Sequence, residues 1–190
     1  MRFRICLVVL VALIPLLQSC VPLVVGAGVG AGMMMAEDRR TNATMLEDQA
    51  IEMKAANRIS EKYKDQGNIS VTSFNRYVLM TGQAPTEEIK QDLSLITLEV
   101  PNVRNVQNET VVSGVSSTSS RASDTLLTSE VKGRLTQNKD VGATHVKVVS
   151  ENGTVFLMGL VTRAEADAAS QTAATTSGAQ RVVKVFEYLD

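Results

Sequence analysis

Val78-Leu79-Met80-Thr81-Gly82 has a counterpart 77 residues further along the chain, Val155-Phe156-Leu157-Met158-Gly159. In both segments a run of apolar residues ends at a glycine, which is typical of a buried strand that stops at a turn. Similarity at a fixed spacing indicates an internal repeat, and a repeat has to be found before a fold is assigned. We therefore interpret the chain as two copies of one structural unit.

The first unit runs from about Leu46 to Val112. Apolar residues recur at every fourth position from Ile51 to Tyr63, as on one face of an amphipathic helix. Pro85, followed by Thr86 and two acids, is typical of a second helix start. The expected elements are a helix over 51–63, strands over 69–71 and 77–81, a helix from Pro85 to Val100, and a strand over 103–112.

The second unit repeats this order. Asp124 is predicted to cap its first helix, and Asn152-Gly153 is a strong hairpin signal. Thr162 with Glu165 forms the pattern of a capping box, and Gly178 suits the C-cap of the helix that follows. The expected elements are a helix over 124–135, strands over 146–148 and 155–157, an Ala-rich helix behind Thr162, and a strand over 181–189.

Both units therefore predict an α+β fold with the order αββαβ. In each, a small mixed three-stranded sheet packs on two helices. The expected domains cover 46–113 and 123–190, and the Ser-, Thr- and Gly-rich residues 114–122 are expected to link them. Gly82 and Gly159 follow the second strand of each unit, where packing or a positive φ favours glycine.

The N-terminal segment has the three parts of a secretory signal. Two arginines precede the apolar run Ile5–Leu17, and Ser19 is the small residue before Cys20. This layout is typical of a signal peptide, and the cysteine after the small residue resembles a bacterial lipobox. A transmembrane helix is the alternative, but 13 apolar residues fall short of the roughly 20 that span a bilayer. We expect residues 1–19 to be removed and Cys20 to be acylated.

Residues 20–45 are predicted to form a lipidated tether. Four glycines between positions 26 and 32 could suggest a phosphate-binding loop, but no Lys-Ser or Lys-Thr pair follows them. Glycine-rich segments of this kind behave as flexible linkers. The residue after Cys20 is Val21 and not an aspartate. In this the chain resembles lipoproteins of the Gram-negative outer membrane. We expect a lipid-anchored protein on the periplasmic face of that membrane.

The composition excludes several functions. Without residues 1–19 the chain carries 17 basic and 20 acidic residues, so no basic face for nucleic acid is expected. His145 is the only histidine, which leaves little for a metal site or a catalytic triad. The pair Glu87-Glu88 is explained by the first turn of a helix, where acids are favourable. We expect no enzyme activity, cofactor, metal or small-molecule substrate.

Several segments of the second unit resemble one family. They are Glu151-Asn152-Gly153, the run from Val155 to Thr162, Glu165-Ala166 and Ser177-Gly178. With the lipobox, a tether ending in Asp38-Arg39-Arg40-Thr41 and a second copy of the unit, the chain resembles the dual BON-domain outer-membrane lipoproteins, the DolP (YraP) group. That resemblance implies two BON domains in an anchored periplasmic protein that contacts phospholipid and supports envelope integrity, with no catalytic chemistry.

The second unit is the better candidate for contact with an anionic membrane, because its net charge is 0 and that of the first is −3. We expect Leu126 to insert among lipid tails while Lys132, Arg134 and Lys139 meet anionic phospholipid headgroups. An ordinary solvated helix face is the alternative at this place. For the whole protein, the alternative function is an adaptor that docks an envelope assembly or division factor, with lipid serving only as its tether.

Overall fold

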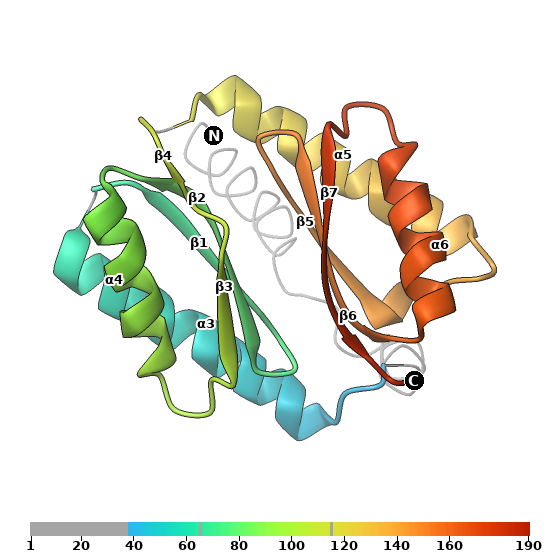
Figure 1. The fold of residues 1–190 in the computed structure, drawn as a ribbon, viewed down its shortest axis with the longest axis horizontal. Coiled ribbons are helices and arrows are strands. Elements are labelled where there is room, and N and C mark those ends of the chain that lie inside the picture. The colour runs from blue at the N-terminus through green and yellow to red at the C-terminus, as the bar shows by residue number, and fades with distance from the viewer. Residues whose placement is uncertain (1–37, 65, 115) are drawn as a thin grey trace, which may run out of the picture. The chain divides into compact units, whose positions relative to one another are not determined.

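The computed structural model describes residues 38–64, 66–114 and 116–190 (Figure 1). The predicted signal peptide, the acylated Cys20 and most of the predicted tether lie outside the described residues. Among the described residues, no helix has both the length and the hydropathy that a membrane span requires. The chain forms two α+β domains, as the repeat predicted: domain 1 over residues 42–112 and domain 2 over residues 118–188.

Domain 1 is a mixed sheet with two helices on one face (Figure 1). Its elements are α3 (Asn42–Tyr63), β1 (Asn68–Phe74), β2 (Tyr77–Ala84), α4 (Glu87–Leu98), β3 (Asn105–Asn108) and β4 (Val111–Val112). β1 pairs antiparallel with β2, and β3 and β4 pair parallel with β2. The Thr41 hydroxyl caps α3 by accepting from the Thr44 N–H. This helix therefore begins inside residues 20–45, which the sequence assigned to the tether.

The third strand of domain 1 is split in two, whereas the sequence predicted one strand over 103–112. The side-chain oxygen Oδ1 of Asn108 accepts from the N–H and the hydroxyl of Thr110, at 3.1 and 2.6 Å. A side chain that bonds the nearby backbone in this way forms a local turn and interrupts the ladder. The Glu109 N–H still donates to the Met80 carbonyl, so the chain stays beside β2.

Domain 2 repeats the arrangement (Figure 1). Its elements are α5 (Thr118–Gln137), the short 3-10 helix η2 (Ala143–His145), β5 (Val146–Glu151), β6 (Thr154–Val161), α6 (Arg163–Ala174) and β7 (Arg181–Tyr188). β6 lies between antiparallel β5 and parallel β7. Ser117 caps α5, so much of the predicted linker 114–122 is helical. The prediction that Asp124 caps this helix is wrong, because Asp124 lies inside it.

Two sequence predictions for domain 2, a capping box and a hairpin turn, are confirmed. Thr162 and Glu165 form both hydrogen bonds of the capping box, and Asn152-Gly153 turns the hairpin with φ of 48° and 71°. Gly178 has a φ of 88°, but α6 already ends at its C-cap Thr175. The glycine therefore serves the turn into β7 and does not cap the helix.

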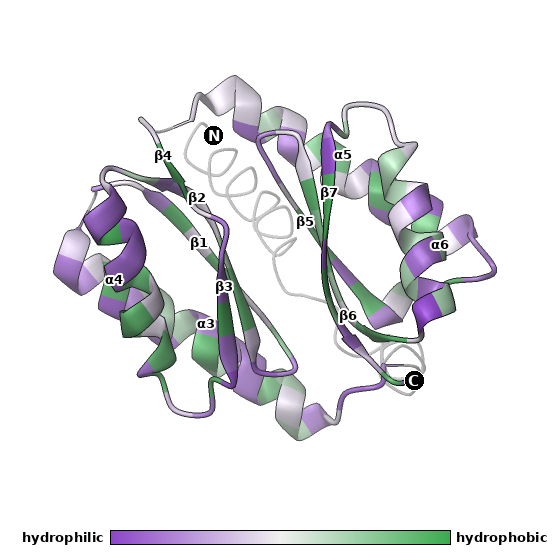
Figure 2. Cartoon of the chain, viewed as in Figure 1, coloured by the Kyte–Doolittle hydropathy of each residue, from purple (hydrophilic) through white to green (hydrophobic). Residues whose placement is uncertain are grey.

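Each domain has its own core between its helices and its sheet. The helices carry alternating hydrophilic and hydrophobic stripes, and the hydrophobic stripes supply these cores (Figure 2). In domain 1 the most buried members are Ile51, Ala55, Val78, Met80, Ala84, Leu93 and Val100. In domain 2 they include Val131, Leu135, Val155, Leu157, Val161 and the alanines 166, 169 and 173 of α6. The small alanine side chains let α6 lie close to its sheet.

A third apolar cluster joins the two domains. We call it the interdomain cluster; its buried members are Phe74, Leu79, Phe156, Met158 and Val185. These side chains belong to β1 and β2 of domain 1 and to β6 and β7 of domain 2. Burial of a large apolar side chain contributes about 1.5–3 kcal/mol, so a shared cluster of this size stabilises the contact between the domains. The sequence had left open whether the domains pack together.

Each domain has a buried aspartate in its first helix. Asp48 in α3 accepts from the N–H groups of Asn75 and Arg76, and Asp124 in α5 accepts from those of Asn152 and Gly153. In each domain the carboxylate therefore ties the helix to the turn of the hairpin. The repeat places the two aspartates in register, but only the tertiary structure reveals their partners.

The two glycines that the sequence placed after the second strands lie inside those strands, Gly82 in β2 and Gly159 in β6, and against backbone carbonyls. A Cβ on Gly82, whose φ is 108°, would be 1.9 Å from the Asn68 oxygen. A Cβ on Gly159 would be 2.3 Å from the His145 oxygen. Neither position has room for a side chain, and at Gly82 the backbone conformation also disfavours one.

Candidate functional site

The outer side of α5 carries the most exposed large apolar side chain among the described residues. Leu126 is 72% exposed, while its neighbour Leu127 is buried, as are Val131 and Leu135. The buried residues hold one side of the helix against the sheet, so Leu126 points away from the core. An isolated exposed leucine is common on protein surfaces, and its chemical surroundings decide what it can do.

The three predicted cations lie at different places around α5. Lys132 is exposed on the helix, and Lys139 is exposed just after the helix ends. The Arg134 guanidinium instead donates to the hydroxyls of Thr176 and Thr175, at 2.8 and 2.9 Å. It therefore links α5 to the end of α6, and its hydrogen-bonding capacity is partly used inside the domain.

Helical spacing decides which residues share the side of Leu126. Residues three, four and seven positions away lie on one side of a helix, and for Leu126 these include Ser129, Glu130 and Gly133. Lys132 lies about a third of a turn away from Leu126 on this geometry. The structure therefore surrounds Leu126 with small and acidic residues, and the cations flank that side without sharing it.

A second group of polar residues holds the segment that leads from the predicted tether. The Arg39 guanidinium donates to the Leu160 carbonyl and to Glu165, at 2.8 and 2.7 Å. The Arg40 guanidinium bonds Asp48 at 2.9 Å and lies 3.9 Å above the ring of Phe74. Arg39 thus contacts domain 2 and Arg40 contacts domain 1. Sequence reasoning missed both contacts, because Leu160, Glu165 and Phe74 lie far along the chain from the two arginines.

His145 belongs to the same group. Its Nδ1 lies 3.0 Å from Glu165 Oε1, at the N-terminus of α6. Burial raises the pKa of the Glu165 carboxyl, but hydrogen bonds from Arg39, Thr162 and His145 outweigh it and lower that pKa to about 2. Among the described residues no cluster of His, Cys, Asp and Glu could hold a metal ion. This group of polar side chains therefore binds the end of the predicted tether to the domains.

Replacing Glu165 with Gln is expected to lower the melting temperature near neutral pH and to have little effect in strong acid. The pKa of about 2 lies below the ordinary 4.5. The stability that the carboxylate contributes is therefore fully present above about pH 4.5 and is lost as the pH falls through about 2. Circular dichroism melts at several pH values check this. A wild-type advantage that stays constant down to pH 2 would contradict it.

The BON domain family matches residues 47–114 and again residues 123–190. These matches coincide with domains 1 and 2, and together they cover more than half of the chain. The chain therefore belongs to the BON-domain family and is a protein with two BON domains.

Two relatives match over most of their length. The chain is 39% identical over 176 residues to outer membrane lipoprotein DolP of Haemophilus influenzae, which covers 92% of this chain and 91% of the relative. It is 32% identical over 154 residues to a 21 kDa hemolysin of Actinobacillus pleuropneumoniae, covering 80% and 79%. The chain is thus a DolP-like dual BON protein and, as predicted, an outer-membrane lipoprotein.

A solved structure with a weaker likeness is the C-terminal domain of CdsD, a structural protein of the type III secretion system of Chlamydia trachomatis. It is 20% identical, covers 75% of this chain and 67% of that chain, and has a TM-score of 0.30. A likeness of this size adds nothing to the family assignment.

Proposed function

We propose that the chain is a non-enzymatic lipoprotein, anchored through acylated Cys20, whose second BON domain binds phospholipid and thereby supports envelope integrity. The observation that carries the proposal is Leu126, which is 72% exposed on a helix whose opposite side forms the core. Moving a leucine side chain from water into apolar surroundings gains about 1.5–3 kcal/mol. A bilayer close to the anchor offers such surroundings.

Headgroup contacts come from Lys132 and Lys139, each worth at most about 1 kcal/mol near an anionic surface. Arg134 contributes less, because Thr175 and Thr176 already hold its guanidinium. Glu130, one turn beyond Leu126, opposes an anionic surface. In this proposal, insertion of the leucine supplies more of the binding free energy than charge does.

Flotation on vesicles tests the proposal. All three apolar clusters lie within the described residues, so a chain that begins at Glu37 keeps both cores while lacking the acyl anchor. We expect it to float with vesicles of phosphatidylethanolamine and phosphatidylglycerol, and less at high salt. Absence of flotation at both salt concentrations would reject direct lipid binding.

Replacing Leu126 with Asp is expected to weaken vesicle binding of this chain about 10- to 100-fold, which corresponds to the lost transfer free energy of leucine. Because Leu126 is exposed, the melting temperature should stay within a few degrees of the wild type. Leu95→Asp is the matched control, since Leu95 is 60% exposed on a helix of domain 1. Equal binding of the wild type and Leu126→Asp would contradict the lipid contact.

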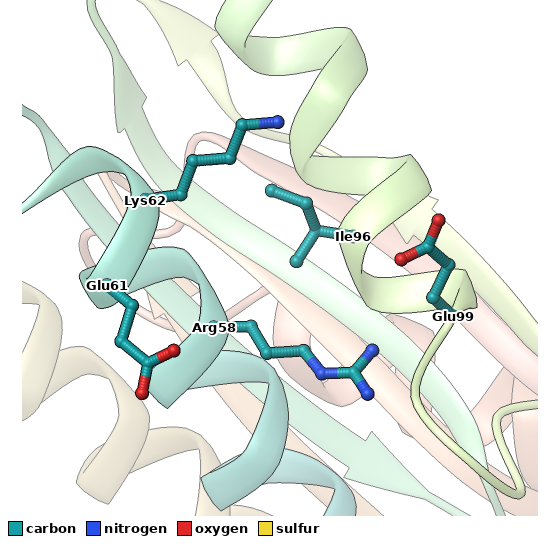
Figure 3. A pocket seen from close by; sticks show the side chains of 5 residues that line it. All are labelled: Arg58, Glu61, Lys62, Ile96 and Glu99. Atoms are coloured by element: carbon teal, nitrogen blue, oxygen red, sulfur yellow. The ribbon is translucent and has the colours of Figure 1, made fainter.

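A second function, that of a protein-interaction adaptor, is favoured by the surface of domain 1. Leu95 and Leu98 are 60% and 48% exposed on α4, beside a groove of about 520 Å³ between α3 and α4. Arg58, Glu61, Lys62, Ile96 and Glu99 line this groove (Figure 3). Figure 3 shows the Arg58 side chain reaching from α3 toward α4. Apolar residues rimmed by charges are typical of docking surfaces.

Photo-crosslinking in cells separates the two functions. A photoreactive residue in place of Leu126 should form adducts with lipid if the second BON domain binds the membrane. A photoreactive residue in place of Leu95 should form an adduct with one defined protein if domain 1 is an adaptor surface, and Leu98→Asp should abolish that adduct. Lipid adducts at both positions would count against the adaptor.

A further inference from the structure

A cleft lies where the two BON domains adjoin, between β1 of domain 1 and α5 and β5 of domain 2. Its volume is about 350 Å³. Small-molecule sites typically occupy about 300–1,000 Å³ and are frequent where domains meet. The cleft therefore has the size and position of a ligand site, and neither the family assignment nor the proposed membrane contact uses it.

Residues from both domains form its walls. On α5, Arg121, Thr125 and Thr128 line the cleft at spacings of four and three residues, which places them along one side of the helix. Ser70 of β1 and Ser150 of β5 line it as well. Leu126 is one residue beyond Thr125, about 100° around the helix. The cleft and the proposed membrane contact therefore lie on different sides of α5.

Two polar groups in these walls have hydrogen-bonding capacity that the described residues do not use. The Thr125 hydroxyl donates to the Arg121 carbonyl at 2.9 Å, so its oxygen can still accept. Glu151 Oε1 accepts from Gln83 Nε2 at 2.5 Å, which leaves its second oxygen as an acceptor.

The charges of the lining disfavour a strongly anionic ligand. One guanidinium, that of Arg121, faces two carboxylates, those of Asp124 and Glu151. The Asp124 carboxylate already accepts two backbone N–H groups, and none of the described residues that line the cleft is aromatic. Carboxylates that accept, a guanidinium that donates and hydroxyls that do both suit a ligand rich in hydroxyl groups.

We propose that this interdomain cleft binds a neutral, hydroxyl-rich ligand about as large as one or two sugar rings. The sugar hydroxyls donate to Glu151 and accept from Arg121, and they pair with the hydroxyl of Thr125. Because both domains contribute, binding also favours their packed arrangement. The chain acts as a receptor for this ligand and carries out no reaction on it.

Saturation-transfer NMR on residues 37–190 tests the proposal with named probes: N-acetylglucosamine, its β-1,4-linked disaccharide and maltose. We expect transfer to the ring protons of at least one of them, with a dissociation constant on the order of 1 mM. Arg121→Ala and Thr125→Val should each weaken that binding about two- to tenfold, the usual effect of losing one hydrogen bond. Both side chains are exposed, so both variants should stay folded.

Thr136→Val is the matched control. The Thr136 hydroxyl donates to the Lys132 carbonyl at 2.9 Å, just as that of Thr125 does to Arg121, but it lies outside the cleft. The Thr136→Val variant should bind the sugar as tightly as the wild type does. The proposal is overturned if no sugar receives saturation, or if the cleft variants bind as the control does. Transfer only to an extended acetyl-tetra-alanine amide would also overturn it, in favour of strand addition at β1 or β5.

Discussion

Replacing Asp48 with Ala is expected to lower the free energy of unfolding by about 3–5 kcal/mol, the usual cost of removing one partner of a buried ion pair. Asp48 is only 3% exposed and accepts from Ser73 Oγ, from two backbone N–H groups of the hairpin turn and from Arg40. The alanine would leave the Ser73 hydroxyl and the two turn N–H groups without this acceptor, and it would remove one of the two carboxylates that bind Arg40, the other being Asp38. Urea unfolding followed by circular dichroism measures the loss.

The neighbouring carboxylate provides the control for this experiment. Glu47 makes a 3.6 Å contact with Arg76 at the surface, and exposed pairs of this kind contribute about 0–1 kcal/mol. Glu47→Ala should therefore leave stability nearly unchanged. Asp124→Ala should fall between the two, because Asp124 accepts the two turn N–H groups but no arginine. A loss below about 1 kcal/mol for Asp48→Ala would show that water replaces the carboxylate.

Replacing Gly82 with Ala is expected to destabilise domain 1 by at least about 2 kcal/mol, since backbone strain and overpacking each cost about 1–3 kcal/mol. The added Cβ would lie 1.9 Å from the Asn68 oxygen, at a φ of 108° that alanine rarely adopts. Gly82 pairs with Ile69 in the β1–β2 ladder, so the strands must shift to make room. The melting temperature and amide exchange of β1 would report this shift.

Gly133→Ala is the matched control for this glycine. Gly133 lies inside α5, and nothing lies within 4 Å of an added Cβ. Alanine in a helix is favoured over glycine by about 0.5–1 kcal/mol, so this variant should be slightly more stable than the wild type. Equal melting temperatures for Gly82→Ala and the wild type would mean that the β1–β2 ladder rearranges around Gly82 without strain.

The two proposed functions, lipid binding and protein docking, use different domains of the same chain. Leu126 on domain 2 and Leu95 on domain 1 are both exposed, and the interdomain cluster joins the domains that carry them. A membrane contact at one domain can therefore present the other domain to a partner. Vesicle flotation and crosslinking at these two leucines measure the two contacts separately.

The sequence by itself determined the features that depend on near neighbours. The repeat, the order of helices and strands, the capping box at Thr162 and the turn at Asn152-Gly153 all rest on residues a few positions apart, so their physical causes are visible in the chain. The same reasoning misplaced Asp124, because an acid near an expected helix start looks like a cap. Its hairpin partners lie 28 and 29 residues away.

Only the tertiary structure decided the features that join distant segments. Arg39 meets Glu165 across 126 residues, and Arg40 lies over the ring of Phe74 in the hairpin of domain 1. The interdomain cluster and the cleft between the domains likewise combine strands from both repeats. Periodicity shows which side of a strand is apolar, but it does not say what covers that side. The choice of partner depends on packing between whole domains, which no short stretch of sequence records.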